Sequence, residues 1–551
     1  ATTVTLDLFR SNNESNRDRS LAYVIRNQGY QFGYDQTIRW KPVYTILNGK
    51  DPYDVTSINR GDLTYSPRDA AEKASSLRLD VERKFVGDGL AGALKFGGKF
   101  RSNVKEQDQA SIVFQTGSNA AGFPYASILR RTEEKTFGAL PIYQYPDLDK
   151  LDALRRGNPQ LFALQVNSAL QNDVVNDYRA QEDTTAAYAM GTVRFGRTTL
   201  ITGMRMEHNT FESRTYRYNS NTPGAPTAVA AQRDYTMWLP GLHLRHELAK
   251  NLILRESYNR SYSRPDVNSL VQGLNLDTNT GNISGGNPNL APELADSFTL
   301  GFVANKFEAD WLQRSFVTLD YWSIELEDVI SAVGASTIVQ RCFNRDNANP
   351  TYDVNNEWCK LFKRDPNLGG VIDLLQLSRN QSFTNTSGVD LTFAWGSELG
   401  GTGGTLDFNV VTTWIEKYES QTTNVDPVND FVGTIGSGTG SSTPEWKMSI
   451  GTTYTRGPVQ LQLTSRYIDS MVHANTVTGG SPTSNTGVPA TWYFDLTGRY
   501  ELAGGLTLRA GINNLTNQEP RIYTPNVQAN TDPSLYDVLG RRAFVSVDLR
   551  L

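Results

Sequence analysis

Apolar and polar residues alternate one by one along many segments of this chain. In 459–464 valine and leucine alternate with glutamine and threonine, and in 492–497 aromatic and leucine residues alternate with polar ones. The segments 77–82, 389–395 and 406–410 show the same pattern. A period of two residues predicts β-strands that have one apolar face. These strands extend to about 12–15 residues, whereas globular strands usually have about 5–6, and a tilted membrane-spanning strand needs about 9–11.

The connections between these segments alternate between short and long from residue 75 onward. Short turns are predicted near Gly87–Gly89, Gly196–Arg197, Ala249–Asn251, Leu399–Gly404, Arg456–Gly457 and Ala503–Gly505, with a slightly longer one near Asn305–Leu312. Long segments are predicted near 104–180, 214–232, 265–292, 328–382, 419–442, 470–488 and 518–540. Compact soluble domains seldom contain so many long loops. Outer-membrane barrels have this asymmetry, with tight periplasmic turns and long external loops.

The expected fold is therefore all-β, a transmembrane antiparallel β-barrel. About fifteen strands are expected between Leu77 and Leu551, and three more near Val4–Phe9, Leu21–Tyr30 and Thr37–Leu47. The total is about eighteen, an even number, as a closed single-chain barrel needs. The first strand would rise from the periplasm and the last would return to it. The polar faces of the strands would line a lumen, among them Arg78, Asp80, Glu82, Gln460, Gln462, Arg466, Arg499 and Glu501.

The composition supports a barrel and excludes two other classes. No stretch approaches the roughly 18 apolar residues of a membrane helix, and the mean hydropathy is -0.45, which excludes a helical membrane protein. The net charge is only -5 and no basic block indicates nucleic acid as a partner. The start at Ala1 has no features of a signal peptide, so the chain is expected to be processed or truncated there.

The two cysteines, Cys342 and Cys359, predict one disulfide that closes a loop, as in an oxidising compartment. Two free thiols are the alternative. Closing such a loop could contribute about 3 kcal/mol in the chain-entropy model.

No catalytic, cofactor or metal site is predicted. His243 and His246 are three residues apart on an expected strand, so their side chains point to opposite faces. His208 and His473 stand alone, and 346–353 lacks the glycine and final glutamate of a Ca²⁺ loop. We therefore expect no enzyme.

Five motifs resemble those of one known family. Asn287–Glu293 (NPNLAPE) resembles the NPxLxPE element of TonB-dependent receptors, and Ser261–Asp266 (SYSRPD) resembles their strand-ending S-x-x-RP segment. Leu239–Leu244 (LPGLHL) is similar to their LPSLNL strand. Ile512–Pro520 and Tyr536–Arg542 are similar to their NLxNxxP signature and to the YD…GRR run before the last strand. The five motifs occur in the family's order.

The resemblance implies an energised receptor in the outer membrane of a Gram-negative bacterium. Residues 1–551 would form its barrel domain, about 18 strands of a probable 22-stranded barrel. Nothing in 1–75 resembles a TonB box or a plug, so the plug and roughly four strands are expected upstream of Ala1, on the same or a separate chain. The implied partners are outer-membrane lipid and lipopolysaccharide, that plug segment, TonB–ExbB–ExbD acting through the plug, and a small-molecule ligand.

The ligand implied by the resemblance is scarce, either an oligosaccharide or a metal chelate. The segments Leu77–Asp80 and Leu94–Arg101 and the two-cysteine loop look most like subfamilies from xanthomonads, caulobacters and sphingomonads, which are often linked to carbohydrate uptake. Loop aromatic residues are the candidate ligand contacts, since flat rings can stack on sugars or pack on apolar groups; the alternative is that they pack the loops together or form the interfacial girdle. The candidates are Phe123, Tyr125, Tyr143, Tyr145 and Trp358.

Two other functions fit the same strand pattern. A passive diffusion porin needs eighteen strands and no plug. A structural or adhesive outer-membrane protein would have a permanently blocked lumen.

Overall fold

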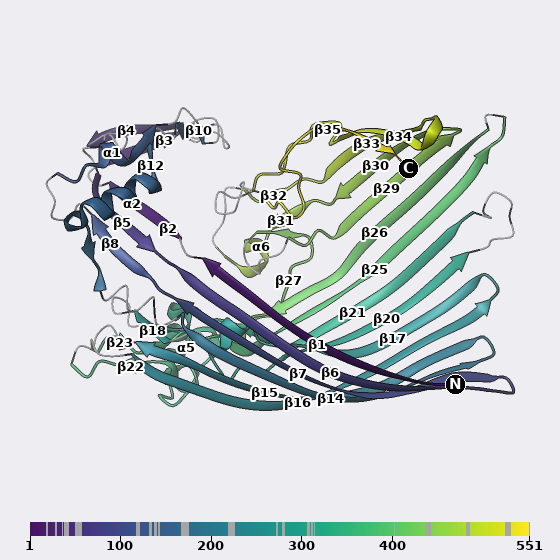
Figure 1. Cartoon of the computed structure of the whole chain (residues 1–551), viewed down its shortest axis with the longest axis horizontal. Coiled ribbons are helices and arrows are strands. Elements are labelled where there is room, and N and C mark those ends of the chain that lie inside the picture. Colours follow the sequence, from purple (N-terminus) through teal and green to yellow (C-terminus); the bar gives the residue numbers. More distant parts are fainter. Residues whose placement is uncertain are drawn as a thin grey trace.

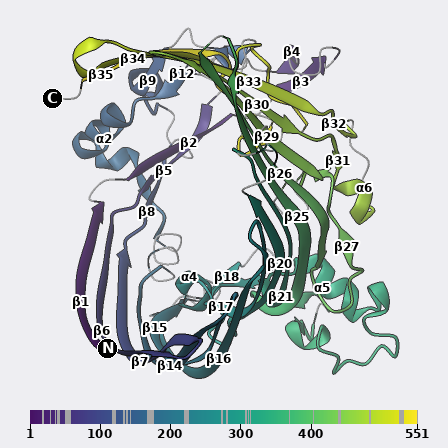
Figure 2. The same ribbon diagram turned by 90° about the vertical axis from the view of Figure 1, so that its right-hand side faces the viewer.

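A computed structural model of the 551-residue chain shows a large, curved antiparallel sheet with long loops at one end (Figures 1 and 2). The structure describes all residues except 18–19, 28–29, 36, 38–42, 50–54, 56–57, 117–121, 132–134, 137–139, 142–143, 167–172, 174–175, 219–225, 272–273, 278–281, 306–308, 310–311, 313, 368, 402, 437–441, 481–484, 524–530 and 550–551.

Sixteen strands of 8 to 23 residues form the sheet, which we call the wall, and each pairs antiparallel with the next. Seen along the wall axis, the sheet is an arc with β1 and β35 at its two ends (Figure 2). The strands are β1 (Thr2–Arg17), β6 (Arg68–Gly87), β7 (Leu90–Gln109), β14 (Tyr178–Phe195), β15 (Thr198–Tyr218), β16 (Thr227–Ala249), β17 (Leu252–Ser263), β20 (Glu293–Asn305), β21 (Phe316–Ser331), β25 (Arg379–Leu399), β26 (Gly404–Gln421), β29 (Trp446–Arg456), β30 (Val459–Ile468), β33 (Thr491–Glu501), β34 (Leu506–Asn513) and β35 (Arg542–Leu549).

The predicted alternation of short and long connections is confirmed. The strand pairs β6–β7, β14–β15, β16–β17 and β29–β30 are each joined by two residues, all at the same end of the wall (Figure 1). The long segments all lie at the opposite end. The fifteen strands expected from Leu77 onward are present, β1 runs toward the loop end, and β35 runs back from it.

Two of the three strands expected near the N-terminus do not belong to the wall. The segment 21–30 contains β2 (Leu21–Asn27), which pairs with β5 (Ile58–Tyr65) in a separate sheet. The segment 37–47 contains the start of β4 (Val43–Gly49), which pairs with β3 (Tyr30–Asp35). These strands have six to eight residues, and they pair with one another or with β8 (Ile112–Thr116) rather than with a wall strand. The wall therefore has sixteen strands among the described residues.

The two faces of the wall differ in polarity because neighbouring residues of a strand point to opposite sides. Across β6, β7, β14, β15 and β16, one registered row begins at Leu79 and ends at Trp238. These two side chains are 49% and 60% exposed, as expected for a lipid-facing surface. The adjacent row contains Asp80, Tyr188 and Arg205. The apolar row is the outer face and the polar row is the inner face.

Two long connections fold together into one loop subdomain beyond the end of the wall. Residues between β1 and β6 supply β2 and β5, and residues between β7 and β14 supply β8 (Ile112–Thr116) and β13 (Ala163–Leu164). These four strands form a sheet in the order β13-β8-β5-β2. Two short helices, α1 (Tyr125–Ile128) and α2 (Leu148–Gly157), complete the subdomain (Figure 1). Its core contains Leu63, Phe123, Tyr125, Ile128, Leu151 and Phe162.

The remaining loops contain short elements. They are β9 (Leu129–Arg131), β10 (Lys135–Thr136), β11 (Leu140–Pro141), β12 (Gln144–Pro146), α4 (Val267–Val271), β18 (Leu274–Asp277), β19 (Asn282–Ser284), α5 (Ala335–Cys342), β22 (Lys363–Arg364), β23 (Val371–Ile372), β24 (Leu374–Leu375), β27 (Asn429–Asp430), β28 (Thr434–Ile435), β31 (Met471–His473), α6 (Asn475–Thr478) and β32 (Gly487–Val488). None of the helices in the described part of the chain is long and apolar enough to cross a membrane.

The two faces should respond differently to a buried charge. We predict that Leu463→Arg, on the outer face of β30, lowers the free energy of unfolding by about 2–4 kcal/mol, because a guanidinium near the middle of the bilayer is poorly solvated. Gln462→Arg, its neighbour on the inner face, is the matched control and should change it by less than about 1 kcal/mol. Urea titration of the protein in lipid bilayers measures both, and equal losses would contradict the assignment of faces.

Candidate functional site: the inner face of the wall

The inner face carries most of the wall's ion pairs. The eight residues predicted to line the lumen share this face in the strand registers, from Arg78 on β6 to Arg499 on β33. Arg255 pairs with Asp320 across β17, β20 and β21. Arg466 lies 3.3 Å from Asp495. An inner surface of this kind is suited to polar or charged molecules.

A cluster of five side chains stabilises the part of the inner face nearest the loops. Arg264 donates to Glu182 at 2.9 Å, and its other terminal nitrogen lies 3.5 Å from Glu207. Glu207 also accepts from Tyr262 at 2.5 Å and from Arg205 at 2.6 Å. Glu207 is only 9% exposed, so its charge depends on these donors. The cluster joins β14, β15 and β17.

The cluster lies where the hydrogen-bond ladder between two strands ends. The register of β16 with β17 stops at Gly241 opposite Asn259. The next residue of β16 is Pro240, which has no N–H to donate and so cannot extend the ladder. Beyond this point Tyr262 and Arg264 provide side-chain contacts to Glu207. These side-chain contacts connect β17 to β15 where β16 and β17 are no longer joined by backbone hydrogen bonds.

A second charged group lies further along the same face, toward the turns. Asp80 is 3% exposed and accepts from Tyr188 at 2.8 Å. Arg78 approaches its other oxygen to 2.5 Å, and Lys95 is 4.0 Å away. Gly97, directly between Asp80 and Tyr188 in the register, is required here because a Cβ would lie 2.4 Å from the Asp80 carboxylate.

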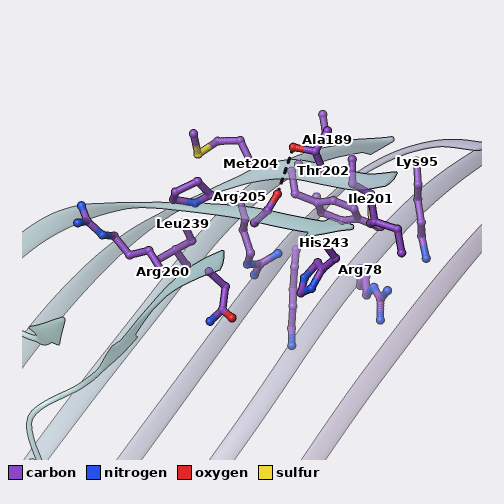
Figure 3. Close-up of a pocket in the computed structure, with 18 residues that line it drawn as sticks. Arg78, Lys95, Ala189, Ile201, Thr202, Met204, Arg205, Leu239, His243 and Arg260 are labelled. Carbon is purple, nitrogen blue, oxygen red and sulfur yellow. Dashed lines mark hydrogen bonds between the residues drawn. The ribbon is translucent and has the colours of Figure 1, made fainter. Parts of the chain in front are cut away.

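A cavity of about 620 Å³ lies between the charged group around Asp80 and the cluster around Glu207 (Figure 3). Arg78, Lys95, Arg205 and His243 all project from one side of the sheet, and Met204 projects from the other. The cavity is thus a hollow in the inner face. The volume lies within the roughly 300–1,000 Å³ range of small-molecule sites.

The loop aromatics proposed as ligand contacts occupy different environments. Phe123 and Tyr125 are 7% and 6% exposed in the core of the loop subdomain, and Trp358 is 2% exposed. Tyr145, on β12, is 42% exposed, and Tyr143 lies outside the described residues. In this conformation Phe123, Tyr125 and Trp358 pack their own loops. Ligand contact by any of the five stays a prediction, with Tyr145 the most accessible of the four described.

The predicted disulfide between Cys342 and Cys359 is present. Beside it, the Arg341 guanidinium lies 4.7 Å from the Trp358 ring centre and donates to Thr423 at 2.8 Å. Arg341 also pairs with Asp426. The disulfide therefore fixes a helix end whose arginine binds the loop between β26 and β29.

The pKa values of Asp177 and Asp147, both in the external loops, are shifted in opposite directions. Burial raises the pKa of Asp177 to about 6, and Asp108 and Asp173 nearby add to the shift, although the backbone N–H of Gln109 opposes it. The hydrogen bond from Arg130 lowers the pKa of Asp147, which caps α2. Both carboxyl groups lie at positions that fix a loop to its base.

The described residues contain no group of three or more His, Cys, Asp or Glu side chains placed to bind a metal. His246 contacts Thr198 at 2.8 Å, and His208 contacts Thr236 at 3.0 Å. His473 accepts from the backbone of Asn475 at 3.1 Å. These are structural contacts within strands and loops.

Four of the five sequence motifs end or begin wall strands, and the fifth, Leu239–Leu244, lies inside β16 where its pairing with β17 stops. Within 287–293, the backbone of Ala291 donates to Asn380 at 2.7 Å and accepts from it at 2.8 Å, which fixes the start of β20 against β25. Within 512–520, Asn514 accepts from the backbone of Gln518 at 2.7 Å and donates its backbone N–H to Asp495. Their residues stabilise the loop end of the wall.

An antiparallel wall with an apolar outer face and a charged inner face defines an outer-membrane β-barrel protein. Residues 7–515 match the family model described as TonB dependent receptor-like, beta-barrel. The chain belongs to that family, whose members are transporters of the Gram-negative outer membrane rather than enzymes.

Two solved structures have the same fold at low sequence identity, and a third aligns with a lower score. The ferric-catecholate import receptor Fiu of E. coli K12 in its closed form aligns with 99% of this chain at 14% identity and a TM-score of 0.50. A chain in the structure of the FpvAI–pyocin S2 complex aligns with 98% at 13% identity and a TM-score of 0.50. The ferripyoverdine receptor of Pseudomonas aeruginosa, bound to ferripyoverdine, aligns with 98% at 13% identity and a TM-score of 0.48.

The chain spans 64% of the Fiu chain and 56% of each of the other two. A comparison with curated protein sequences gives no significant match.

The sequence interpretation missed the partners within the inner face. It named Arg78 and Asp80, but not Tyr188, Arg205 or Glu207. A usable signal was present, since Tyr188 and Glu207 occupy the polar phase of alternating strands. Their contacts depend on pairings between distant segments, such as the 82 residues that separate Glu182 from Arg264.

The cluster around Arg264 should contribute measurably to stability. We predict that Arg264→Gln lowers the free energy of unfolding by about 1–3 kcal/mol, because Glu207 loses a counter-charge while remaining buried. Arg245→Gln removes a more exposed pair with Glu247 and should cost less than about 1 kcal/mol. Urea unfolding in lipid compares the two variants. An equal loss of unfolding free energy would show that the cluster contributes no more to stability than an exposed ion pair.

The disulfide should protect its loop without stabilising the wall. We predict that the double variant Cys342→Ser, Cys359→Ser is cleaved faster by protease within 331–379, since about 3 kcal/mol of loop constraint is lost. The rate of cleavage in the long loop between β7 and β14 and the thermal midpoint of the wall are internal controls. A wall that unfolds at a clearly lower temperature would contradict this prediction.

Proposed function

We propose that this chain forms the wall and external loops of a TonB-dependent receptor that takes up a scarce ligand across the outer membrane. The observation that carries the proposal is the polarity of the wall, whose inner face presents charged groups such as Arg78, Arg205 and Asp320 while the outer face is apolar. Membership of the receptor family supports the energised mechanism.

A plug and further strands are part of this proposal. Among the residues described, β1 has a register only with β6, and β35 only with β34. Unpaired backbone groups are not tolerated in lipid, so we infer that additional strands of the receptor cover the two outer edges. The domain described by 1–551 would then be the larger part of the barrel, and a plug in its lumen would contact TonB.

A metal chelate is our preferred ligand and an oligosaccharide the second. Fiu, which has the same fold, is a ferric-catecholate import receptor. Cationic residues on the inner face, including Lys95 and Arg205, suit a ligand with anionic groups. Tyr145 remains the accessible aromatic residue for either ligand.

Uptake with and without TonB separates this proposal from a porin. We predict that deleting the gene abolishes growth on at least one ferric chelate or oligosaccharide supplied as the limiting nutrient at micromolar concentration. Deleting TonB should give the same loss, because the plug would not move. If the protein is a passive porin, the TonB-deficient strain still grows on the nutrient. If it is a structural protein, deleting its gene leaves growth unchanged with or without TonB. Either outcome would refute the proposal.

A further inference from the structure

The floor of the hollow in the inner face is formed by two glycines on adjacent strands. Gly203 on β15 and Gly241 on β16 are directly opposite in the register. A Cβ on Gly203 would lie 2.7 Å from the Cβ of Met190, so this position cannot hold a larger residue without a shift. A Cβ on Gly241 would meet no atom within 4 Å. The space above Gly241 is therefore open, and the apolar side chains of Ile201 and Leu239 line it.

One side of the hollow has more cations than its carboxylates neutralise. Arg78 and Lys95 lie 2.5 and 4.0 Å from the Asp80 carboxylate, and Arg78 also lies 3.9 Å from Asp7. Lys99 also lines the hollow and lies directly opposite Arg78 in the register. Two cations facing each other repel, and Lys99 has no ion-pair partner among the residues that the structure describes. Its ammonium group is available to a bound anion.

The opposite side adds no excess of negative charge. Arg205 is paired with Glu207 at 2.5 Å, and that carboxylate is shared with Arg264. His243 projects from the same side of the sheet as Arg205 and Lys95 (Figure 3). The hollow thus combines an apolar floor with a cationic rim.

We propose that this hollow binds a small molecule with an apolar body and one anionic group, a carboxylate or a phosphate. The apolar body would lie over Gly241 against Ile201 and Leu239, and the anion would face Lys99 and Arg78. A pocket of this volume accommodates such a ligand. The proposal does not depend on energised uptake, because it concerns binding to the wall itself.

The test uses two probes with the same ring and different charge, 2-naphthoate and the neutral 2-naphthalenemethanol. Equilibrium dialysis of the full-length protein in a nonionic detergent measures both, with protein-free micelles as the blank. We expect naphthoate to bind at least about tenfold more tightly, since a hydrogen-bonded charge adds affinity in a partly desolvated site. Lys99→Gln should reduce this preference to about twofold or less. Lys84→Gln, on an exposed side chain paired with Glu82 outside the hollow, should leave the preference unchanged.

Filling the floor gives an independent test. Gly241→Phe should abolish binding of both probes, because the new ring takes the open space, whereas Gly241→Ala should keep binding within about threefold. Thermal unfolding verifies that each variant is folded; if Gly241→Phe does not fold, Lys99→Gln alone decides. The proposal is overturned if wild-type protein binds neither probe, if Lys99→Gln keeps the full preference, or if folded Gly241→Phe binds naphthoate as the wild type does. TonB-dependent growth is measured separately and can fail without affecting this result.

Discussion

A backbone that crosses lipid must satisfy all its hydrogen bonds within the protein, and the rest of this structure follows from that constraint. Each wall strand pairs with its neighbours, and side chains are left to alternate between two environments. The outer face can then be apolar, as at Leu79 and Trp238, without affecting the inner one. The charges on the inner face are possible only because the alternation keeps them away from lipid.

Side-chain contacts replace backbone hydrogen bonds where the pairing of β16 with β17 stops. Pairing of β16 with β17 ends at Gly241 and Asn259, next to Pro240. Just beyond, Tyr262 and Arg264 contact Glu207 on β15. A charged cluster thus connects the wall where main-chain bonds cannot. The same glycine that ends the register also leaves the hollow open, because its missing side chain removes the one group that would fill it.

The sequence predicted the wall well because long alternating strands are a local pattern. The strands from 77 onward and the positions of short turns and long loops needed no information about distant contacts. The segments 21–30 and 37–47 were misassigned because a short strand in a loop sheet has the same alternation as one in the wall, and only its length and partner differ. Similarly, no local pattern distinguishes buried loop aromatics such as Phe123 from exposed ones such as Tyr145.

The loop subdomain shows why such partners cannot be read locally. Its central pairing joins Leu63 on β5 to Phe114 on β8, across the whole β6–β7 hairpin. That hairpin is also what brings the two loops together, since β1 pairs with β6 and β7 pairs with β14 in the wall. Two external segments that leave neighbouring strands start close in space, so little chain entropy is lost when they form a common core. The order of strands in the wall therefore determines which loops can combine above it.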